Sequence, residues 1–367
     1  MADCIARIAL WSVDRLEPFI DQLAQDLAQC RDAMDGDGSK LIILNGKKAR
    51  VSMLSSGSYV ALAVGADQDR IKSKKIMDQE LKITLAAAPM IDASTRRSEQ
   101  RTRRLIHNLK TLTAKTTQEI FYVIKQESMI SQPREAIRYV EEEIKDNTFD
   151  TAKALIEVLK HQQAQKAEFA AFEKLSGKID YTKMEMHDIH RVLMNVFYLF
   201  FGDFSDKKVR ATVESTRLQA FFDYDSIYAC IFYLVENAAK YTMRNSSLNV
   251  TATADNQGFI DIRFEMQSLA IRPEEEHSVF DEGISGRHAH ANKLNGAGIG
   301  LFLARAMARL NAGTLSLNAG KPMIAGVYAR NSFVLSLRAE PICSGQPIPD
   351  SGLSFSSATA GGSPSLN

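Results

Sequence analysis

The sequence contains few cysteines, no long apolar run and no excess of charge of either sign, and each lack excludes a class of protein. Its four cysteines, Cys4, Cys30, Cys230 and Cys343, form no CxxC pair and have no histidine cluster beside them. This scatter excludes a zinc ribbon and a disulfide framework, and it is typical of a reducing compartment. The longest apolar stretches, such as residues 227–235, reach about half of the roughly 20 residues that a membrane-spanning helix needs.

The charges are balanced, with 45 Lys and Arg against 44 Asp and Glu and a formal net charge of +1. Such a balance creates no basic field, which argues against nucleic acid as a partner. The N-terminal stretch carries early acidic residues and no cleavage site after an apolar core, so we expect no signal peptide. The sequence therefore predicts a cytoplasmic protein without a membrane span, and its 367 residues predict two to three domains.

Residues 1–69 predict a small α+β module, a candidate sensory module that contains no chemical motif. Residues 3–33 carry apolar side chains at helical spacing and predict a helix; the pattern consists of Ile8, Leu16, Phe19, Leu23 and Leu27. Residues 41–44 and 49–54 flank Asn45-Gly46, which favours a type I′ turn and so predicts a hairpin. Residues 59–64 predict a further strand.

Residues 70–176 predict a helical domain with two apolar seams. The first seam follows steps of three and four residues through Ile106, Leu109, Thr113, Thr116, Ile120 and Val123. The second begins on a helix near Thr148 and follows Leu155, Val158, Gln162, Gln165, Phe169 and Phe172. Pro133 begins a predicted short helix in the connector. Because two helices cannot bury both seams alone, we expect a homodimer with a four-helix bundle.

Residues 177–340 predict a mixed α/β domain, and residues 341–367, rich in Ser, Gly and Pro, predict a disordered tail. The predicted elements are helices over 187–201, 225–242 and 298–311, and strands over 208–214, 247–254, 258–266, 313–318 and 332–338. The last helix follows the run GAGIGL, which begins at Gly296. Closely spaced glycines ahead of a helix N-terminus suit phosphate binding, although a flexible loop entering a helix is the plainer alternative.

A second motif lies inside the predicted helix over 225–242, where residues 233–242 read YLVENAAKYT. Asn237 and Lys240 lie three residues apart and share a helix face. An amide oxygen can ligate Mg²⁺ and an ammonium can neutralise phosphate, whereas the plainer alternative is an exposed polar face.

The two motifs together resemble the ATP-binding domain of sensor histidine kinases and their relatives in the gyrase, Hsp90 and MutL superfamily. Residues 279–283, VFDEG, look like the lid segment of that domain, and residues 221–225 look like the approach to its Asn-bearing helix. The resemblance implies a C-terminal α/β sandwich that binds ATP and Mg²⁺ between a helix layer and a flexible lid. It places Mg²⁺ at Asn237 and the nucleotide at Asn237, Lys240, Tyr241, Met266, Gly296, Gly298, Gly300 and Leu301.

Upstream, residues 104–112 read RLIHNLKTL and resemble the phosphoacceptor box of the same kinases. His107 lies one position off the first seam, on the flank of the bundle, where a separate domain could bring ATP to it. A neutral imidazole can attack a γ-phosphoryl group. A solvent-facing helix histidine is the alternative. The resemblance assigns the chemistry to His107, Asn108 and Thr111, the last at the position that the family uses to orient water for phosphatase action.

Four departures from the family's pattern stand out, and one of them, Leu112 in place of the common Pro, only removes a helix kink. Met266 stands where an Asp receives the adenine amino group, and a thioether accepts only weak hydrogen bonds. Tyr233 stands where the wider family has Asn or Glu. Asn108 follows His107 in place of a carboxylate and cannot act as a general base.

The sequence therefore predicts a multi-domain α+β protein: an N-terminal module, a helical-hairpin domain for dimerisation and phosphotransfer, and an ATPase domain of histidine-kinase type. We expect ATP-dependent autophosphorylation on His107 and phosphotransfer to an Asp of a response-regulator receiver domain. The alternative is a pseudokinase or phosphatase-type regulator whose altered nucleotide pocket binds a partner kinase or receiver. A third interpretation is an ATPase that phosphorylates no protein.

Overall fold

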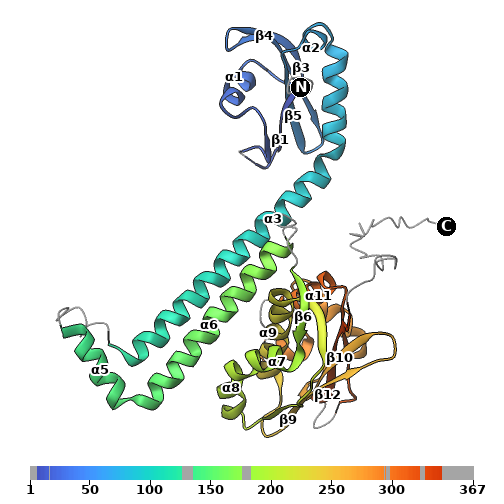
Figure 1. Ribbon diagram of the computed structural model, residues 1–367. Coiled ribbons are helices and arrows are strands. Elements are labelled where there is room, and N and C mark those ends of the chain that lie inside the picture. The colour runs from blue at the N-terminus through green and yellow to red at the C-terminus, as the bar shows by residue number, and fades with distance from the viewer. Residues whose placement is uncertain are drawn as a thin grey trace. The chain divides into compact units, whose positions relative to one another are not determined.

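The structure is a computed structural model that describes residues 6–15, 17–125, 135–175, 183–292, 294, 298–322 and 327–340 (Figure 1). The chain divides into two compact units, Met1–Arg104 and Leu105–Asn367, and one long helix, α3 (Lys74–Val123), contributes residues to both. No helix in these ranges is both long and apolar enough to cross a bilayer. The finer division at residues 69, 176 and 340 stays a prediction.

The first unit contains one five-stranded antiparallel sheet with the order β2-β1-β5-β4-β3. The elements are β1 (Arg7–Ser12), β2 (Ile20–Asp21), α1 (Leu27–Asp32), β3 (Gly38–Leu44), β4 (Lys47–Ser56), β5 (Tyr59–Gly65) and α2 (Gln68–Lys72). Successive residues of β5 enter two different cores, because side chains alternate along a strand. Leu62 packs on the α1 side, whereas Ala61 and Ala63 pack against Met77 at the start of α3.

The predicted hairpin is confirmed, and the predicted helix over residues 3–33 is wrong. Asn45 and Gly46 have φ values of 51° and 76°, as a type I′ turn requires. Residues 7–12 form strand β1, which pairs with β5 along its whole length. Leu10 is buried on one face of the sheet and Trp11 on the other, so no apolar–polar alternation marks this strand. Leu16 lies outside the described residues.

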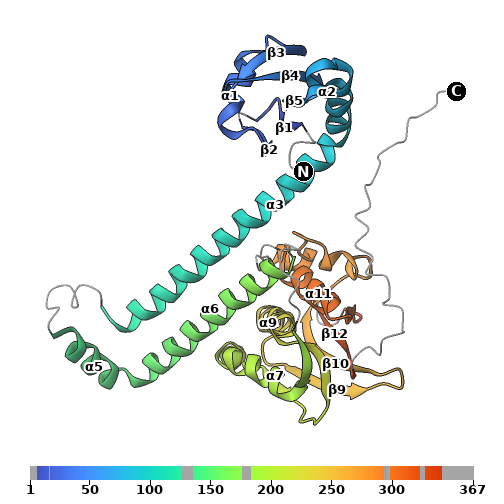
Figure 2. The ribbon, with the colours of Figure 1, turned by 45° about the horizontal axis from the view of Figure 1, so that its top comes forward.

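The second unit begins with a helical hairpin. It consists of the C-terminal half of α3 and of α6 (Thr148–Leu175), with the short helix α5 (Ala136–Asp146) between them in the sequence. Figures 1 and 2 both show α6 running alongside this part of α3, and the Gln165 amide donates to the Thr113 hydroxyl at 3.3 Å. The predicted helix from Thr148 is confirmed, and Pro133 lies outside the described residues.

The rest of the unit is a two-layer domain, here called the C-terminal domain. Its main sheet has the order β11-β12-β10-β9-β7, and a second sheet pairs β6 with β8. Its elements are β6 (Met184–Asp188), α7 (Ile189–Phe197), α8 (Phe201–Asp206), β7 (Arg210–Val213), β8 (Gln219–Asp223), α9 (Tyr224–Tyr241), β9 (Ser247–Ala254), β10 (Phe259–Leu269), α10 (Arg287–Ala291), α11 (Gly300–Leu310), β11 (Thr314–Asn318) and β12 (Tyr328–Arg338). Helices α7, α9 and α11 cover one face of the main sheet (Figure 2). The mixed α+β class, with a long helical region and a C-terminal layered sheet, is confirmed.

Several predicted bounds in this domain need correction. The helix predicted over 187–201 begins only at Ile189, because the Asp188 carboxylate caps it by accepting from the Arg191 backbone N–H at 2.7 Å. Strand β6 precedes this cap. Strand β10 continues past residue 266 to Leu269, and β12 begins at Tyr328 instead of residue 332, because the two strands pair over their whole length.

Helix α9 is the central element of the C-terminal domain, and its predicted bounds are confirmed within one residue. Every side chain from 227 to 235 is buried. The helix packs against strand β10 of the main sheet and against α6, α7 and α11. On the hairpin side, Ala164, Ala167 and Ala171 of α6 belong to the same core as α9. Their small side chains allow the two helices to approach closely.

Four lysines of α6 form ion pairs with aspartates of the C-terminal domain. They are Lys153–Asp206 at 3.7 Å, Lys160–Asp203 at 2.9 Å, Lys166–Asp225 at 2.8 Å and Lys174–Asp223 at 2.8 Å. Asp223 is the most buried of these acids, with 5% of its side chain exposed. It also caps α9, because its carboxylate accepts from the Ser226 backbone N–H at 3.0 Å and from the Ser226 hydroxyl at 2.6 Å.

We expect Asp223→Ala to lower the free energy of unfolding by about 3 kcal/mol, because it removes the cap of α9 and a buried partner of Lys174. Denaturant unfolding of the whole chain measures this change. Asp225→Ala is the matched control. It breaks the exposed pair with Lys166, whose side chains are 54% and 51% exposed, and should cost about 0.5 kcal/mol. Equal losses of unfolding free energy in the two variants would contradict the role of Asp223 as a buried cap of α9.

The same variant has a predicted pH dependence. Burial alone would raise the pKa of Asp223, but hydrogen bonds from Lys174 and Ser226 outweigh burial and hold that pKa below its ordinary value of 3.8. The stabilisation by Asp223 is therefore present above pH 3.8 and is lost as the pH falls through the lowered pKa. The difference in free energy of unfolding between the unmodified chain and Asp223→Ala should therefore become smaller as the pH falls through that range.

Candidate functional site

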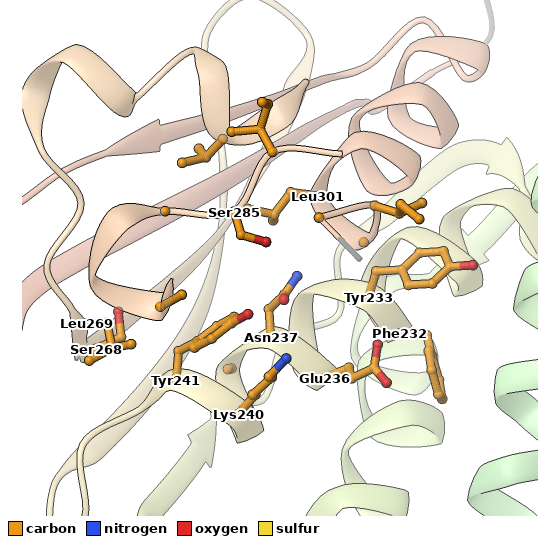
Figure 3. A pocket seen from close by; sticks show the side chains of 18 of the residues that line it. Phe232, Tyr233, Glu236, Asn237, Lys240, Tyr241, Ser268, Leu269, Ser285 and Leu301 are labelled. Atoms are coloured by element: carbon orange, nitrogen blue, oxygen red, sulfur yellow. The ribbon is translucent and has the colours of Figure 1, made fainter. Parts of the chain in front are cut away.

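A cavity of about 520 Å³ lies in the second unit, between the helical hairpin and the C-terminal domain (Figure 3). Its walls come from α3, α6, α9, the end of β10, residues 279–289 and the start of α11. The sequence-predicted residues that line it are His107, Asn108, Thr111, Asn237, Lys240, Tyr241, Met266, Gly298, Gly300 and Leu301. Gly296 lies outside the described residues. The structure thus brings together residues from distant parts of the sequence, and their individual roles stay predictions.

One face of α3 forms a wall of the cavity. His107, Thr111 and Lys115 follow one another at intervals of four residues, so their side chains lie on one helix face. His107 is exposed, and the Thr111 hydroxyl donates to the His107 carbonyl oxygen at 3.0 Å. Lys110 does not line this cavity and lies beside a separate hollow that Ile106 also lines.

Helix α9 supplies the polar side chains of the opposite wall. Figure 3 shows Asn237 and Lys240 projecting from α9 toward the side on which Ser285 and Leu301 lie. Burial lowers the pKa of Lys240, and the nearby Glu236 opposes this effect. The Tyr241 hydroxyl donates to the Leu294 carbonyl oxygen at 3.2 Å, which ties the end of α9 to the segment before the glycines.

Two carboxylates also line the cavity, Glu236 from α9 and Glu168 from α6. Water reaches Glu236 from the cavity, but protein atoms surround its carboxylate on the other sides. Burial raises the pKa of Glu236, and the negative charge of Glu168 raises it further. Lys240 and Lys115 act in the opposite direction.

The glycines at the start of α11 permit a tight backbone approach. Gly298 has a φ of +66°, and a Cβ there would lie 2.6 Å from the Ile284 carbonyl oxygen. Its own carbonyl oxygen accepts from the Gly283 N–H at 3.0 Å. A Cβ at Gly300 would lie 3.3 Å from the amide nitrogen of Asn237. The backbone N–H groups of the first turn of α11, which have no partner within the helix, therefore border the cavity beside Asn237, an arrangement that suits an anion.

The segment that resembles a lid is anchored on α11. Phe280 is buried, and the Arg305 guanidinium lies 4.7 Å from the centre of its ring. Arg305 also donates to the Phe280 carbonyl oxygen at 3.2 Å and to the Asp281 carboxylate at 3.3 Å. These contacts hold one end of the segment, and residues 284–286 continue from it along the cavity.

The end of β10 forms an apolar part of the cavity wall. Met266 is 4% exposed, and its sulfur accepts a weak hydrogen bond from the Thr242 hydroxyl at 3.6 Å. Glu265 is exposed and does not line the cavity, because neighbouring residues of a strand face opposite sides. Ser268 lines the cavity and accepts from the buried Asn331 amide at 2.9 Å. A carboxylate that could receive an adenine amino group is therefore missing from the position at Met266.

The donor set suits a magnesium ion that arrives with a phosphate ligand. Within the ranges that the structure describes, no three His, Cys, Asp or Glu side chains gather as a metal cage. Asn237 offers one amide oxygen in the cavity. Mg²⁺ commonly takes one or two protein ligands and completes its shell with water and phosphate oxygens, so Asn237 fits this ion.

Sequence reasoning missed three charged residues of the cavity, Lys115, Glu168 and Glu236. Lys115 could have been found from its spacing of eight residues from His107, which returns to the same helix face. Glu236 is the neighbour of Asn237 within the recognised motif. Glu168 has no such signal, because only the docking of α6 brings it to the cavity.

Residues 222–340 match the family described as "Histidine kinase-, DNA gyrase B-, and HSP90-like ATPase". No curated protein sequence is significantly similar to the chain. Among solved structures, the mycobacterial sensor histidine kinase MprB is 20% identical, with a TM-score of 0.37, and the match covers 43% of this chain and 99% of that one. The Acinetobacter baumannii histidine kinase AdeS is 13% identical, with a TM-score of 0.37 and coverage of 65% and 98%. Full-length ShkA in complex with AMPPNP is 14% identical, with a TM-score of 0.41 and coverage of 66% and 46%.

The apolar wall at Met266 leads to a prediction about base selectivity. Since the position at Met266 offers no carboxylate to an adenine amino group, ATP and GTP should bind within about tenfold of each other, or about 1.4 kcal/mol. Calorimetric titration with each nucleotide measures the ratio. Met266→Asp should restore a preference for ATP, whereas Lys240→Ala should weaken both nucleotides alike. A hundredfold preference for ATP in the unmodified chain would contradict the assignment of Met266 to the base.

Proposed function

We propose that this chain, which carries an ATPase domain of the histidine kinase, DNA gyrase B and HSP90 type over residues 222–340, is a protein histidine kinase. In this proposal it transfers the γ-phosphoryl group of ATP to His107 and then to an aspartate of a response-regulator receiver domain. The observation that carries the proposal is that His107 and Asn237 line the same cavity, although 130 positions separate them in the sequence.

Different residues of the cavity bind the magnesium ion, the phosphates and the base of ATP. The Asn237 amide oxygen holds Mg²⁺, which neutralises phosphate charge when bound. The Lys240 ammonium and the N–H groups from Gly298 to Leu301 hold the phosphates, with Gly296 in the same glycine segment. The base lies against the apolar wall formed by Met266 and Leu269, near Tyr241. Phosphate contacts therefore supply most of the affinity.

Phosphoryl transfer then requires only His107 as a reacting side chain. The unprotonated ring nitrogen forms a bond to the γ-phosphorus while the bond to the bridging β–γ oxygen breaks, and that electron pair leaves with ADP. The other ring nitrogen keeps its proton, so the product is a phosphoimidazolium and the charges balance. Asn108 can accept a hydrogen bond from that N–H and orient the ring, and no general base is needed. Thr111 lies one turn further along the same face, where it can position a water for a phosphatase reaction.

Donor and acceptor belong to the same chain in this arrangement. The walls of the cavity that carry His107 and Asn237 both lie within residues 105–367. Ala164, Ala167 and the Lys–Asp pairs of α6 support this placement, because they hold the hairpin against the C-terminal domain. In this proposal the γ-phosphoryl group is therefore transferred within one chain.

A second candidate function is a regulator with an altered nucleotide pocket that binds a partner kinase or receiver. The observation that favours it is Met266, which leaves the base wall without a carboxylate. In that case the cavity would bind nucleotide weakly, and the surface around His107 would act as a docking site.

Labelling separates the two candidates. ATP labelled at the γ-phosphorus should mark the chain with phosphate that is labile in acid and stable in base, as expected for phosphohistidine. His107→Gln should abolish the label, because it removes the attacking nitrogen. Label that survives in this variant would move the acceptor elsewhere, and no label in the unmodified chain would favour the regulator.

The hairpin exposes apolar side chains that a second copy of the chain could cover. Ile106 and Ile120 on α3 are 47% and 42% exposed, and Leu155 and Phe169 on α6 are 64% and 47% exposed. These residues belong to the two seams of the sequence pattern. Because both seams run along the same hairpin, pairing with a second hairpin would bury them in a four-helix bundle.

We expect Ile120→Asp and Phe169→Asp each to yield monomers, because a carboxylate in the buried seam is costly. Analytical ultracentrifugation measures the oligomeric state. Since His107 and the cavity lie in one chain, the monomers should still label themselves. Unchanged dimers in both variants would argue against this interface, and monomers that label only when mixed with unmodified chain would argue against transfer within one chain.

A further inference from the structure

Lys115 is the only lysine of the described part of α3 that borders the cavity. It lies two turns beyond His107 on the same helix face, with Thr111 between them. Lys110 is closer to His107 in the sequence, but it lines the separate hollow beside Ile106. The packing of the hairpin on the C-terminal domain therefore makes Lys115, and not Lys110, a residue of the acceptor side of the cavity.

The charges of the cavity wall are balanced before an anion binds. The charged side chains of the wall are Lys115, Lys240, Glu168 and Glu236, whose formal charges cancel. Among the described residues, Lys115 forms no ion pair, and it lies within electrostatic range of Glu236 and His161. A nucleoside triphosphate is strongly anionic, so its entry would give the cavity an excess of negative charge that both lysines can reduce.

We propose that Lys115 binds the γ-phosphoryl group while it passes from ATP to His107, from the side opposite Lys240. This inference rests on the proposed kinase function. In phosphoryl transfer the negative charge spreads over the equatorial oxygens of the moving group, and fixed cations stabilise that charge. Lys240 belongs to the donor wall and Lys115 to the acceptor wall, so the moving group stays neutralised along its path. Lys115 transfers no proton.

The position of Lys115 predicts which kinetic constant it affects. Lys240, the first turn of α11 and Asn237 lie on the donor side, on elements other than α3. The affinity for ATP should therefore depend little on Lys115. The rate of transfer should depend on it strongly, because the ammonium group acts on charge that moves toward His107.

The test uses the full chain in single-turnover labelling, with nucleotide affinity measured separately by calorimetry with a non-hydrolysable ATP analogue. Lys115→Ala should slow labelling of His107 at least about tenfold and change the nucleotide Kd by less than about threefold. Lys115→Arg should recover most of the rate, because it keeps the positive charge. Lys110→Ala is the matched control and should label within about twofold of the unmodified chain.

Each other outcome overturns the inference. A Lys115→Ala chain that labels at the unmodified rate would show that no cation is needed there. A proportional loss of nucleotide affinity would place Lys115 in ground-state binding. An equal loss of labelling rate in Lys110→Ala would show that lining the cavity does not distinguish Lys115 from Lys110. Failure of the unmodified chain to label would instead overturn the proposed function, and this inference with it.

Discussion

The docking of α6 against α9 is the contact on which the candidate site depends. Helix α9 carries Asn237 and Lys240, and the hairpin that includes α6 carries His107 and Lys115. Without this contact each set would face solvent on a separate element. The close approach is possible because Ala164, Ala167 and Ala171 present little volume to α9, so that backbone lies near backbone over several turns.

Ion pairs flank this packed stripe and contribute unequally. Lys166–Asp225 and Lys153–Asp206 are largely exposed, and exposed pairs contribute little because water and salt screen them. Asp223 differs, since it is buried, pairs with Lys174 and caps α9 at once. The same carboxylate thus fixes the start of α9 and binds the C-terminal end of α6 through Lys174. The docking therefore has a firm point at Asp223 and weaker, salt-sensitive pairs at Asp206 and Asp225.

Elements whose structure depends on residues near in sequence were predicted correctly. The Asn45-Gly46 turn, the start of α6 at Thr148 and the extent of α9 all follow from turn preferences, helical spacing and apolar content. The helix predicted over residues 3–33 failed because strand β1 is buried on both faces and shows no alternation. The strand needed its partner β5, which lies about 50 residues further along, to be recognised.

The sequence by itself determined which residues are candidates for chemistry: the Asn–Lys pair on one helix face, the glycines before α11 and the histidine box are all local patterns. Its resemblance to the kinase family also predicted that Met266 stands where that family has an Asp. Only the tertiary structure decided that His107 and Asn237 share a cavity, that Glu168 belongs to it, and that Lys115 faces it while Lys110 does not. The physical reason is that helical periodicity tells which residues share a face, whereas the packing of α6 on α9 decides which face meets the cavity.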